Sequence, residues 1–300
     1  MTGTSAISTH GLIKSYGQIR ALRGVDLEVQ HGEIFGFLGP NGSGKTTTIR
    51  CLLDLIRPNG GTLRVLGRDP QRDSLAVRAR TGYLPGELRV DDSFTVEAAL
   101  KFFGALRGHT LDWTYVRELA ERFSLDLQLS VKNLSKGNKQ KVGVVQALMH
   151  RPELLMLDEP TSGLDPLMQR EVLAVVRAAR EAGATIFFSS HVLSEVEAIA
   201  DRVGIIRRGE VVEVANTQAL IERAQRRVVV RFKQAIDLAD LAALPGVTVI
   251  SHNGVDCQLH VTGEMDGLIK TLAAYPVSEL EIERASLEEI FLTYYDEAHA

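Results

Sequence analysis

The stretch GPNGSGKTT, residues 39–47, has the residue types and spacing of a loop that binds phosphate. It fits the pattern G-x-x-x-x-G-K-[ST], in which glycines let backbone N–H groups converge on phosphate oxygens and the next helix adds positive charge at its N-terminus. Lys45 would reach the β- and γ-phosphates of a nucleotide, and the Thr46 hydroxyl would ligate Mg²⁺. The residues predicted to bind the nucleotide here are Gly39, Pro40, Asn41, Gly42, Ser43, Gly44, Lys45, Thr46 and Thr47.

Polar residues that suit the same chemistry follow two apolar runs. Asp158 and Glu159 come directly after LLML at 154–157, and His191 follows TIFF at 185–188. Side chains alternate faces along a strand, so we expect Asp158 to hold the Mg²⁺ shell and Glu159 to polarise a water for attack on the γ-phosphate. Because ligands of open parallel sheets bind at the carboxyl ends of strands, His191 should reach the same phosphate. Taken alone, these residues would equally suit an acidic strand cap and a structural histidine.

The flanks of the phosphate loop predict the fold. Residues 34–38 (IFGFL) are wholly apolar, as in a buried parallel strand, and apolar residues recur at helical spacing from 49 to 56. With the two later apolar runs, this order predicts an α/β fold with a P-loop NTPase (RecA-like) core. Two additions are expected: an antiparallel β subdomain from strands within 7–30 and 62–66, and a helical subdomain from helices at 95–106, 113–123 and 137–149.

The last quarter of the chain has its own order of elements. From residue 226, short apolar strands alternate with helices predicted at 238–244 and 264–274, which indicates a small C-terminal α+β domain. Ser286 and Glu289 make a candidate capping box for a final helix.

Composition excludes several classes of protein. The chain of 300 residues has a net charge of −4 and no long basic block, which argues against nucleic acid as the main partner. No stretch approaches the roughly 18 to 20 apolar residues that cross a bilayer, and the first ten residues lack the pattern of a secretion signal. We therefore expect a soluble chain that is not secreted. Cys51 and Cys257 lack metal-ligand spacing and are predicted to be reduced and structural.

Together the motifs over residues 7–215 resemble the ATP-binding subunit of an ABC transporter. The run LSKGNKQK at 134–141 resembles the signature sequence of that family, SGLD ending at Asp165 resembles its D-loop, and His191 resembles its switch histidine. Tyr16 resembles the aromatic residue that stacks on adenine, although a tyrosine at a strand end is also common in ordinary packing. The resemblance implies ATP and Mg²⁺ as the ligands.

The family also implies a head-to-tail dimer, here expected as an ATP-dependent homodimer. Each ATP would lie between the phosphate loop of one chain and the signature of the other. Catalysis would fall to Glu159, with His191 and Lys45 stabilising charge on the phosphoryl group. The implied domains are an ATPase domain over 1–220, with its helical subdomain at about 87–150, and an accessory domain over 226–300. The signature residues expected at the partner's nucleotide are Ser135, Lys136, Gly137 and Asn138.

One position departs from the family pattern. After TGYLP, where the family usually has a glutamine that contacts Mg²⁺ and the attacking water, this chain has Gly86 and then Glu87. We hypothesise that Glu87 partly substitutes as a ligand in the metal shell, one position later in the chain.

The wording of three segments is similar to bacterial exporters of the ABC-2 type: the signature run, HRPELLMLDEPTSGLDP and IERASLEEIF. This similarity implies a peripheral protein on the cytoplasmic face of the cell membrane that powers export through a separate integral membrane permease. Drug or antibiotic efflux matches best, and lipid or polysaccharide export is the alternative. A regulatory subunit that binds nucleotide without hydrolysing it, and a soluble ABC ATPase acting on ribosomes or DNA, are the more distant alternatives.

Overall fold

The computed structural model describes residues 5–108, 111–223 and 226–283 of the chain. It divides into two compact units, residues 1–215 and 216–300. The predicted domains leave residues 221–225 between them, whereas in the structure helix α8 (Thr217–Arg223) belongs to the second unit. None of the helices within the described ranges is long and apolar enough to cross a membrane.

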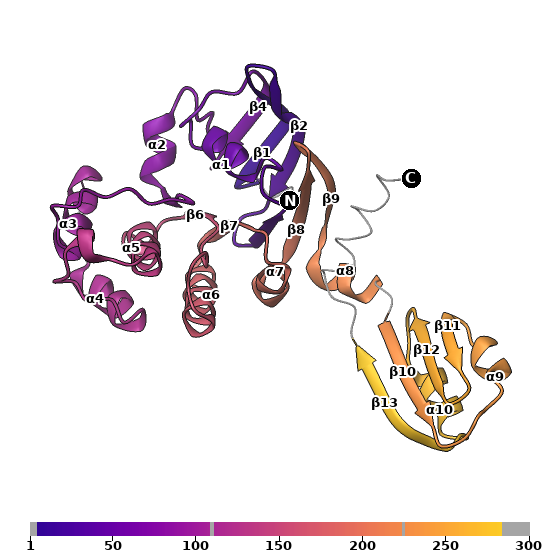
Figure 1. Cartoon of the computed structure of the whole chain (residues 1–300). Helices are drawn as coiled ribbons and strands as arrows, with labels where there is room; N and C mark the ends of the chain where they lie inside the picture. Colours follow the sequence, from indigo (N-terminus) through magenta and orange to yellow (C-terminus); the bar gives the residue numbers. More distant parts are fainter. Residues whose placement is uncertain (1–4, 109–110, 224–225, 284–300) are drawn as a thin grey trace. The chain divides into compact units, whose positions relative to one another are not determined.

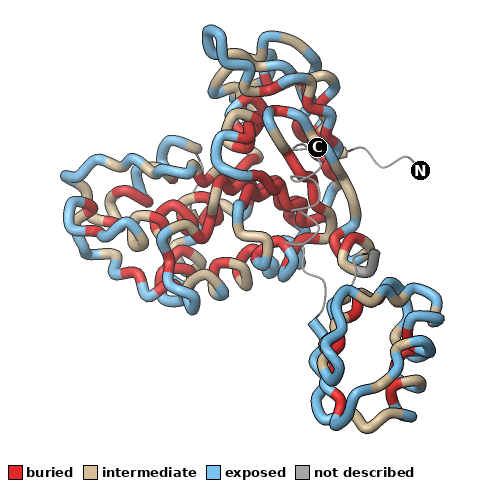
Figure 2. The backbone as a smooth tube through the Cα atoms, turned by 45° about the vertical axis from the view of Figure 1, so that its right-hand side comes forward, coloured by how far each residue is buried: buried red, intermediate tan, exposed pale blue. Residues whose placement is uncertain are grey.

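A six-stranded sheet forms the centre of the first unit, in the order β5-β6-β7-β3-β8-β9. Neighbouring strands from β5 to β8 pair in parallel, and every residue of β3, β6 and β7 is buried, which explains the apolar runs IFGFL, LLML and IFF within them. These strands form the most deeply buried part of the unit (Figure 2). Their bounds are β3 Ile34–Leu38, β5 Thr81–Leu84, β6 Leu154–Asp158, β7 Thr185–Ser190, β8 Arg202–Arg207 and β9 Glu210–Asn216.

A separate three-stranded antiparallel sheet has the order β2-β1-β4, as the alternating sequences predict. It consists of β1 Ile7–Tyr16, β2 Ile19–Val29 and β4 Gly60–Val65. Helix α1 (Lys45–Leu52) contacts both sheets, and its buried Ile49 and Leu52 join the core that they share. The helix that follows the phosphate loop is therefore fixed by packing on two sides (Figure 1).

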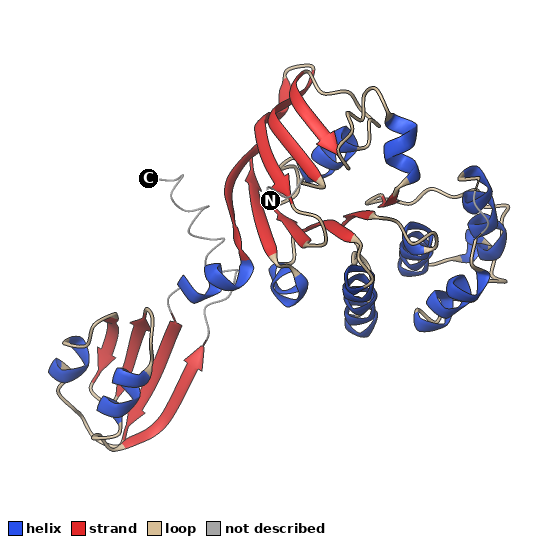
Figure 3. Cartoon of the chain, turned by 180° about the vertical axis from the view of Figure 1, so that it is seen from behind, coloured by secondary structure: helices blue, strands red, loops and turns tan. Residues whose placement is uncertain are grey.

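Helices on the other side of the central sheet complete the unit. Figure 1 shows α5, α6 and α7 along that face, and Figure 3 shows α3 and α4 as a helical group beside α5. Four of these helices, α3, α4, α5 and α6, begin at side-chain caps: Thr95, Asp112, Ser135 and Asp165 each accept a hydrogen bond from a backbone N–H in the first turn. The bounds are α2 Ser74–Ala79, α3 Val96–Leu106, α4 Trp113–Arg122, η1 Val131–Asn133, α5 Lys136–Leu148, α6 Pro166–Glu181 and α7 Leu193–Ile199. The predicted helical insertion is confirmed by α3, α4 and α5.

In the described part of the second unit, a four-stranded antiparallel sheet in the order β11-β12-β10-β13 packs with two short helices, α9 and α10, and helix α8 precedes the sheet in the chain. Val228, Val230, Phe232 and Leu259 form its core with residues of both helices. The predicted final helix, with the capping box of Ser286 and Glu289, lies outside the described residues. The bounds are β10 Arg226–Phe232, α9 Ala239–Ala242, β11 Val247–Asn253, β12 Asp256–Val261, α10 Asp266–Leu272 and β13 Val277–Glu283.

Candidate functional site

The three strands that precede the predicted site residues are direct neighbours in the central sheet. β7 lies between β6 and β3. The register pairs Leu38 at the end of β3 with Ser190 on β7, and Asp158 at the end of β6 with Ser189. The phosphate loop, the acidic pair and the histidine thus emerge from adjacent carboxyl ends at one edge of the sheet, where open α/β sheets bind ligands.

The phosphate loop has room for its turns only because glycines occupy them. A Cβ at Gly39 would overlap the hydroxyl of Ser43 and the backbone oxygen of Ile206, and Gly44 has a φ of 118°, a conformation that favours glycine. Lys45 is buried in its own loop, where Nζ donates hydrogen bonds to the backbone oxygens of Gly39 at 2.6 Å and Pro40 at 3.3 Å. The ammonium group of Lys45 is therefore fixed within the phosphate loop by these two backbone oxygens.

Asp158 joins the loop to the neighbouring strand. Its carboxylate is 1% exposed and accepts a hydrogen bond on each oxygen, from the Thr46 hydroxyl at 2.7 Å and from the Ser189 hydroxyl at 2.6 Å. A carboxylate and a threonine hydroxyl in contact are both hard oxygen ligands of the kind that Mg²⁺ prefers. The structure thus brings together the two residues that the sequence predicts as metal ligands.

Glu159 lies against two other predicted catalytic residues. One carboxylate oxygen, Oε1, lies 3.2 Å from Lys45 Nζ, and the other, Oε2, contacts Nδ1 of His191. The backbone of Glu159 has a φ of 55°, in the left-handed region that non-glycine residues rarely occupy. Such a conformation costs about 1–3 kcal/mol and is common where a side chain must be aimed for function.

The signature and D-loop residues form a second surface of the same unit. Ser135 caps helix α5 by accepting a hydrogen bond from the N–H of Asn138 at 3.2 Å, and Lys136 is exposed beside it. A Cβ at Gly137 would come within 2.9 Å of the backbone oxygen of Gly163, so the helix start and the turn before Asp165 are in close contact. Asp165 in turn caps α6, through bonds from the N–H groups of Leu167 and Met168.

Tyr16 and Glu87 lie outside this network of contacts. Tyr16 is 45% exposed at the end of β1, with Lys14 Nζ 5.2 Å from the centroid of its ring, and stacking on adenine stays a prediction. The Glu87 side chain is 78% exposed and pairs with Arg89 at 3.3 Å. The position that lies against Asp158 is Gly86, where a Cβ would be 3.3 Å from Oδ2. A metal-binding role for Glu87 stays a prediction.

Two residues of this site had no predicted role. Ser189 donates to Asp158 and accepts from the N–H of Glu159 at 3.2 Å, and Gln140 donates from Nε2 to the backbone oxygens of Glu159 and Pro160. Both are buried. The sequence did carry a signal for Ser189, because a serine at the end of a wholly apolar strand needs a hydrogen-bond partner.

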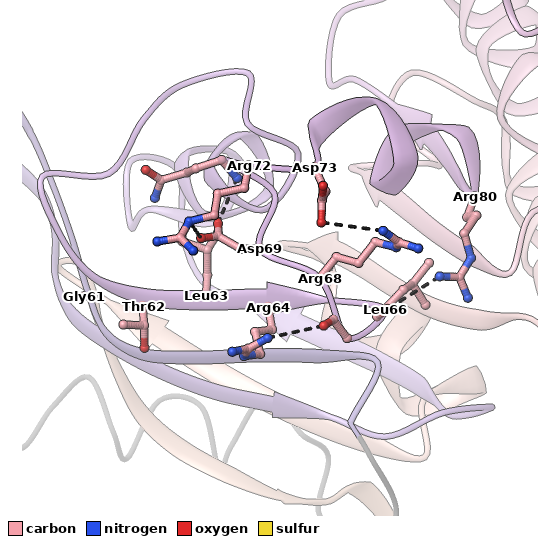
Figure 4. Close-up of a pocket in the computed structure, with 12 residues that line it drawn as sticks. Gly61, Thr62, Leu63, Arg64, Leu66, Arg68, Asp69, Arg72, Asp73 and Arg80 are labelled. Carbon is pink, nitrogen blue, oxygen red and sulfur yellow. Dashed lines mark hydrogen bonds and ion pairs between the residues drawn. The ribbon is translucent and has the colours of Figure 1, made fainter.

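A cavity of about 740 Å³ lies elsewhere in the first unit, between β4 and α2. Figure 4 shows its arginines engaged by neighbouring groups. Arg68 pairs with Asp73 at 3.6 Å and Arg72 with Asp69 at 3.5 Å. Because these charges are matched and largely exposed, the cavity offers no chemistry comparable with the strand-end site.

The strand-end site fits a nucleotide with its metal. Buried polar atoms without hydrogen-bond partners include Ser43 Oγ in the loop and Glu159 Oε1 beside Lys45, which are atoms that a bound phosphate and its water could engage. The glycine turns at Gly39 and Gly44 leave the loop backbone accessible to phosphate oxygens. Thr46 and Asp158, which place two oxygen atoms 2.7 Å apart, are the residues that would hold Mg²⁺.

Comparison with known proteins gives a consistent result. A family described as "ABC transporter" matches residues 22–162. The chain is 34% identical to the daunorubicin/doxorubicin resistance ATP-binding protein DrrA of Streptomyces peucetius, over 96% of this chain and 92% of that protein. It is 33% identical to the bacitracin transport ATP-binding protein BcrA of Bacillus licheniformis, over 96% of this chain and 97% of that protein.

Solved structures agree on the fold. An ATP-binding subunit of an ABC transporter superposes with a TM-score of 0.67 at 29% identity, covering 72% of this chain and 92% of that chain. A dimeric bacterial ABC transporter cassette gives a TM-score of 0.64 at 21% identity, covering 70% of this chain and 98% of that chain. The predicted α/β class with a P-loop core is confirmed.

Proposed function

The chain belongs to the ABC transporter family of ATP-binding proteins, and from that premise we propose that it powers export of a drug or antibiotic through a separate membrane subunit. The observation that carries the proposal is the convergence of Lys45, Thr46, Asp158, Glu159 and His191 at one edge of the central sheet. Two relatives that match nearly the whole chain are named for resistance to, or transport of, antibiotics. The proposed location is the cytoplasmic face of the membrane.

The geometry supports a distinct task for each residue. Glu159 is the base that orients and deprotonates the attacking water, because its carboxylate is held between Lys45 and His191 at the mouth of the site. Lys45 and His191 are the donors that stabilise negative charge on the transferring phosphoryl group. Bound Mg²⁺, held by Thr46 and Asp158, would supply charge neutralisation between the phosphates.

The signature surface supports a role across a dimer interface. Ser135 and Lys136 are exposed at the N-terminus of α5, where backbone N–H groups and the helix dipole favour an anion. We therefore propose an ATP-dependent homodimer, in which the signature residues, Ser135 to Asn138, contact the γ-phosphate bound to the phosphate loop of the partner. Tyr16 would stack on the adenine.

We propose that the membrane subunit docks in a groove of about 660 Å³ between α1 and the helical insertion, which we call the arginine groove. Its apolar lining includes Leu55 and Phe103, and its charged lining includes Arg50, Arg78 and Arg107. The described hydrogen bonds of Arg78 and Arg107 go to neutral groups, the Ser74 hydroxyl and the backbone oxygens of Arg78 and Thr81, and burial lowers the pKa of the Arg107 guanidinium. An acidic cytoplasmic segment of the permease would complement these positive charges.

The decisive experiment compares the unaltered chain with Glu159→Gln. Steady-state hydrolysis of MgATP by the purified chain should fall at least about a hundredfold in the variant, because a general base contributes on the order of 10²–10⁴ in rate. Size-exclusion chromatography with light scattering should show an ATP-dependent dimer of the variant, since nucleotide binding is retained while turnover is blocked. An unaltered chain whose hydrolysis does not depend on Glu159 would refute the proposed mechanism.

A further inference from the structure

The turn that carries Glu159 is held in place through its backbone. The N–H of Glu159 donates to the backbone oxygen of Ser189 at 3.1 Å and lies 3.2 Å from its hydroxyl, while the backbone oxygen of Glu159 accepts from the N–H of Ser162 at 3.1 Å. With a φ of 55°, this residue does not rest in a preferred conformation. The direction of its carboxylate therefore depends on contacts from outside the turn.

One such contact comes from a different part of the unit. Gln140 is 6% exposed, and its amide nitrogen donates to the backbone oxygen of Glu159 at 2.9 Å and to that of Pro160 at 3.0 Å. The two hydrogens of the Gln140 amide can thus be donated to the backbone oxygens of two consecutive residues in the strained turn. Buried bonds of this kind are protected from competition by water, so they constrain the turn more than exposed bonds would.

Gln140 belongs to helix α5, whose first turn is the signature. It lies three residues after Gly137, on the same side of the helix as the contact between Gly137 and the D-loop turn. A displacement of α5 would therefore move the support of Glu159 together with the signature surface.

We propose that Gln140 is a positioning residue. It makes the orientation of the Glu159 carboxylate depend on the position of helix α5, which begins with the signature, in the same chain. This inference rests on the proposed function, in which the signature contacts the nucleotide of the partner. When α5 of one chain moves onto the nucleotide of the partner, Gln140 would fix the conformation of the Glu159 turn in its own chain. A single side chain would thus link the two nucleotide sites of the dimer. The structure gives the linkage a direction, because Gln140 acts on the Glu159 of its own chain and not on that of the partner.

The first test is kinetic. Gln140→Met retains the length of the side chain and removes both donors, and Gln140→Glu retains the shape but turns acceptors toward two backbone oxygens. We expect kcat for ATP hydrolysis to fall roughly tenfold or more in both variants, with KM for ATP changed less than about twofold, because two hydrogen bonds to the turn are lost while the phosphate loop is intact. Gln128→Met is the matched control, since the Gln128 amide bonds an exposed carboxylate of the helical subdomain, that of Glu97.

The second test separates positioning from a general loosening of α5. In mixed dimers, one chain carries Glu159→Gln and only the other can hydrolyse ATP. Gln140→Met should abolish most of the remaining activity when placed in the hydrolysing chain, and should leave it within about twofold when placed in the Glu159→Gln chain. The reverse dependence would mean that the substitution damages the signature, and it would overturn the proposal.

Equal kcat for the Gln140 variants, the control and the unaltered chain would also overturn it. A variant that fails to fold is recognised by loss of its thermal transition, and Gln140→Glu then serves as the second variant. If the unaltered chain itself shows no hydrolysis that depends on Glu159, the proposed function fails instead, so the two failures are distinguishable.

Discussion

Replacing Ser189 by alanine tests how much the hydroxyl at the end of β7 contributes to the site. The Ser189 hydroxyl donates to Oδ1 of Asp158 at 2.6 Å and accepts from the N–H of Glu159. Both the serine and the aspartate are essentially inaccessible to water, at 0% and 1% exposure. The substitution therefore leaves one oxygen of a buried carboxylate without a donor, while the other oxygen keeps the hydroxyl of Thr46.

The expected loss of stability follows from this geometry. A hydrogen bond to a charged group contributes about 1.5–3 kcal/mol, and water cannot replace it here because the site is closed. For a cooperative unit of roughly 150–250 residues, each kcal/mol shifts Tm by about 2–4 °C. The melting transition of the first unit should therefore fall by about 3–12 °C in Ser189→Ala.

Circular dichroism during a thermal scan, without nucleotide and with Mg²⁺ removed, measures this shift. The matched control is Ser93→Ala, which removes a bond of the same type and nearly the same length, from the Ser93 hydroxyl to Asp91 at 2.7 Å, at an exposed position. Water replaces that donor, so the control should leave Tm nearly unchanged. Equal Tm shifts for the two variants would refute the argument that burial makes the Ser189 bond costly to remove.

Two further predictions concern the groove and a buried thiol. In a titration with permease in nanodiscs, Arg50→Glu should weaken binding of the permease to the arginine groove at least about tenfold, with the largest loss at low salt. The control, Arg57→Glu, changes a residue outside the groove and should have little effect on binding. Equal losses of affinity for the two variants would show that the groove is not part of the docking surface. Burial raises the pKa of Cys51 to about 11, so little thiolate forms near pH 8 and iodoacetamide should label the folded chain far more slowly than the chain in denaturant; equal labelling rates would show that the thiol is accessible.

The parts of the site that could be predicted are those encoded in consecutive residues. The phosphate loop is one continuous motif, and its strand and helix were confirmed because the apolar pattern on each side is long and regular. Asp158 and His191 could be placed at one edge of the sheet because parallel strands end on the same side. These predictions needed no knowledge of which strands are neighbours.

The missed features depend on contacts between distant parts of the chain. Nothing in the sequence near Gln140 shows that its amide meets the backbone of Glu159, nineteen residues away. The left-handed conformation of Glu159 was likewise not visible, because glutamate has no preference for it and the surrounding bonds impose it. Strand β5 and helix α2 were not predicted because each is short, at four and six residues, and too brief to show a clear period.

Gly86 and Glu87, which stand where the family usually has a glutamine, lie next to two different surfaces. Gly86 lies against Asp158 without a side chain, and Glu87 lines the arginine groove, where it pairs with Arg89. The family glutamine, by resemblance, contacts the metal and also relays nucleotide state to the membrane subunit. In this chain Gly86 lies next to Asp158 and Glu87 lines the groove, so we propose that a relay through this segment runs along its backbone. Because that backbone joins β5 to the helical insertion, one short loop contacts both Asp158, the proposed metal ligand, and the groove in which we propose that the permease docks.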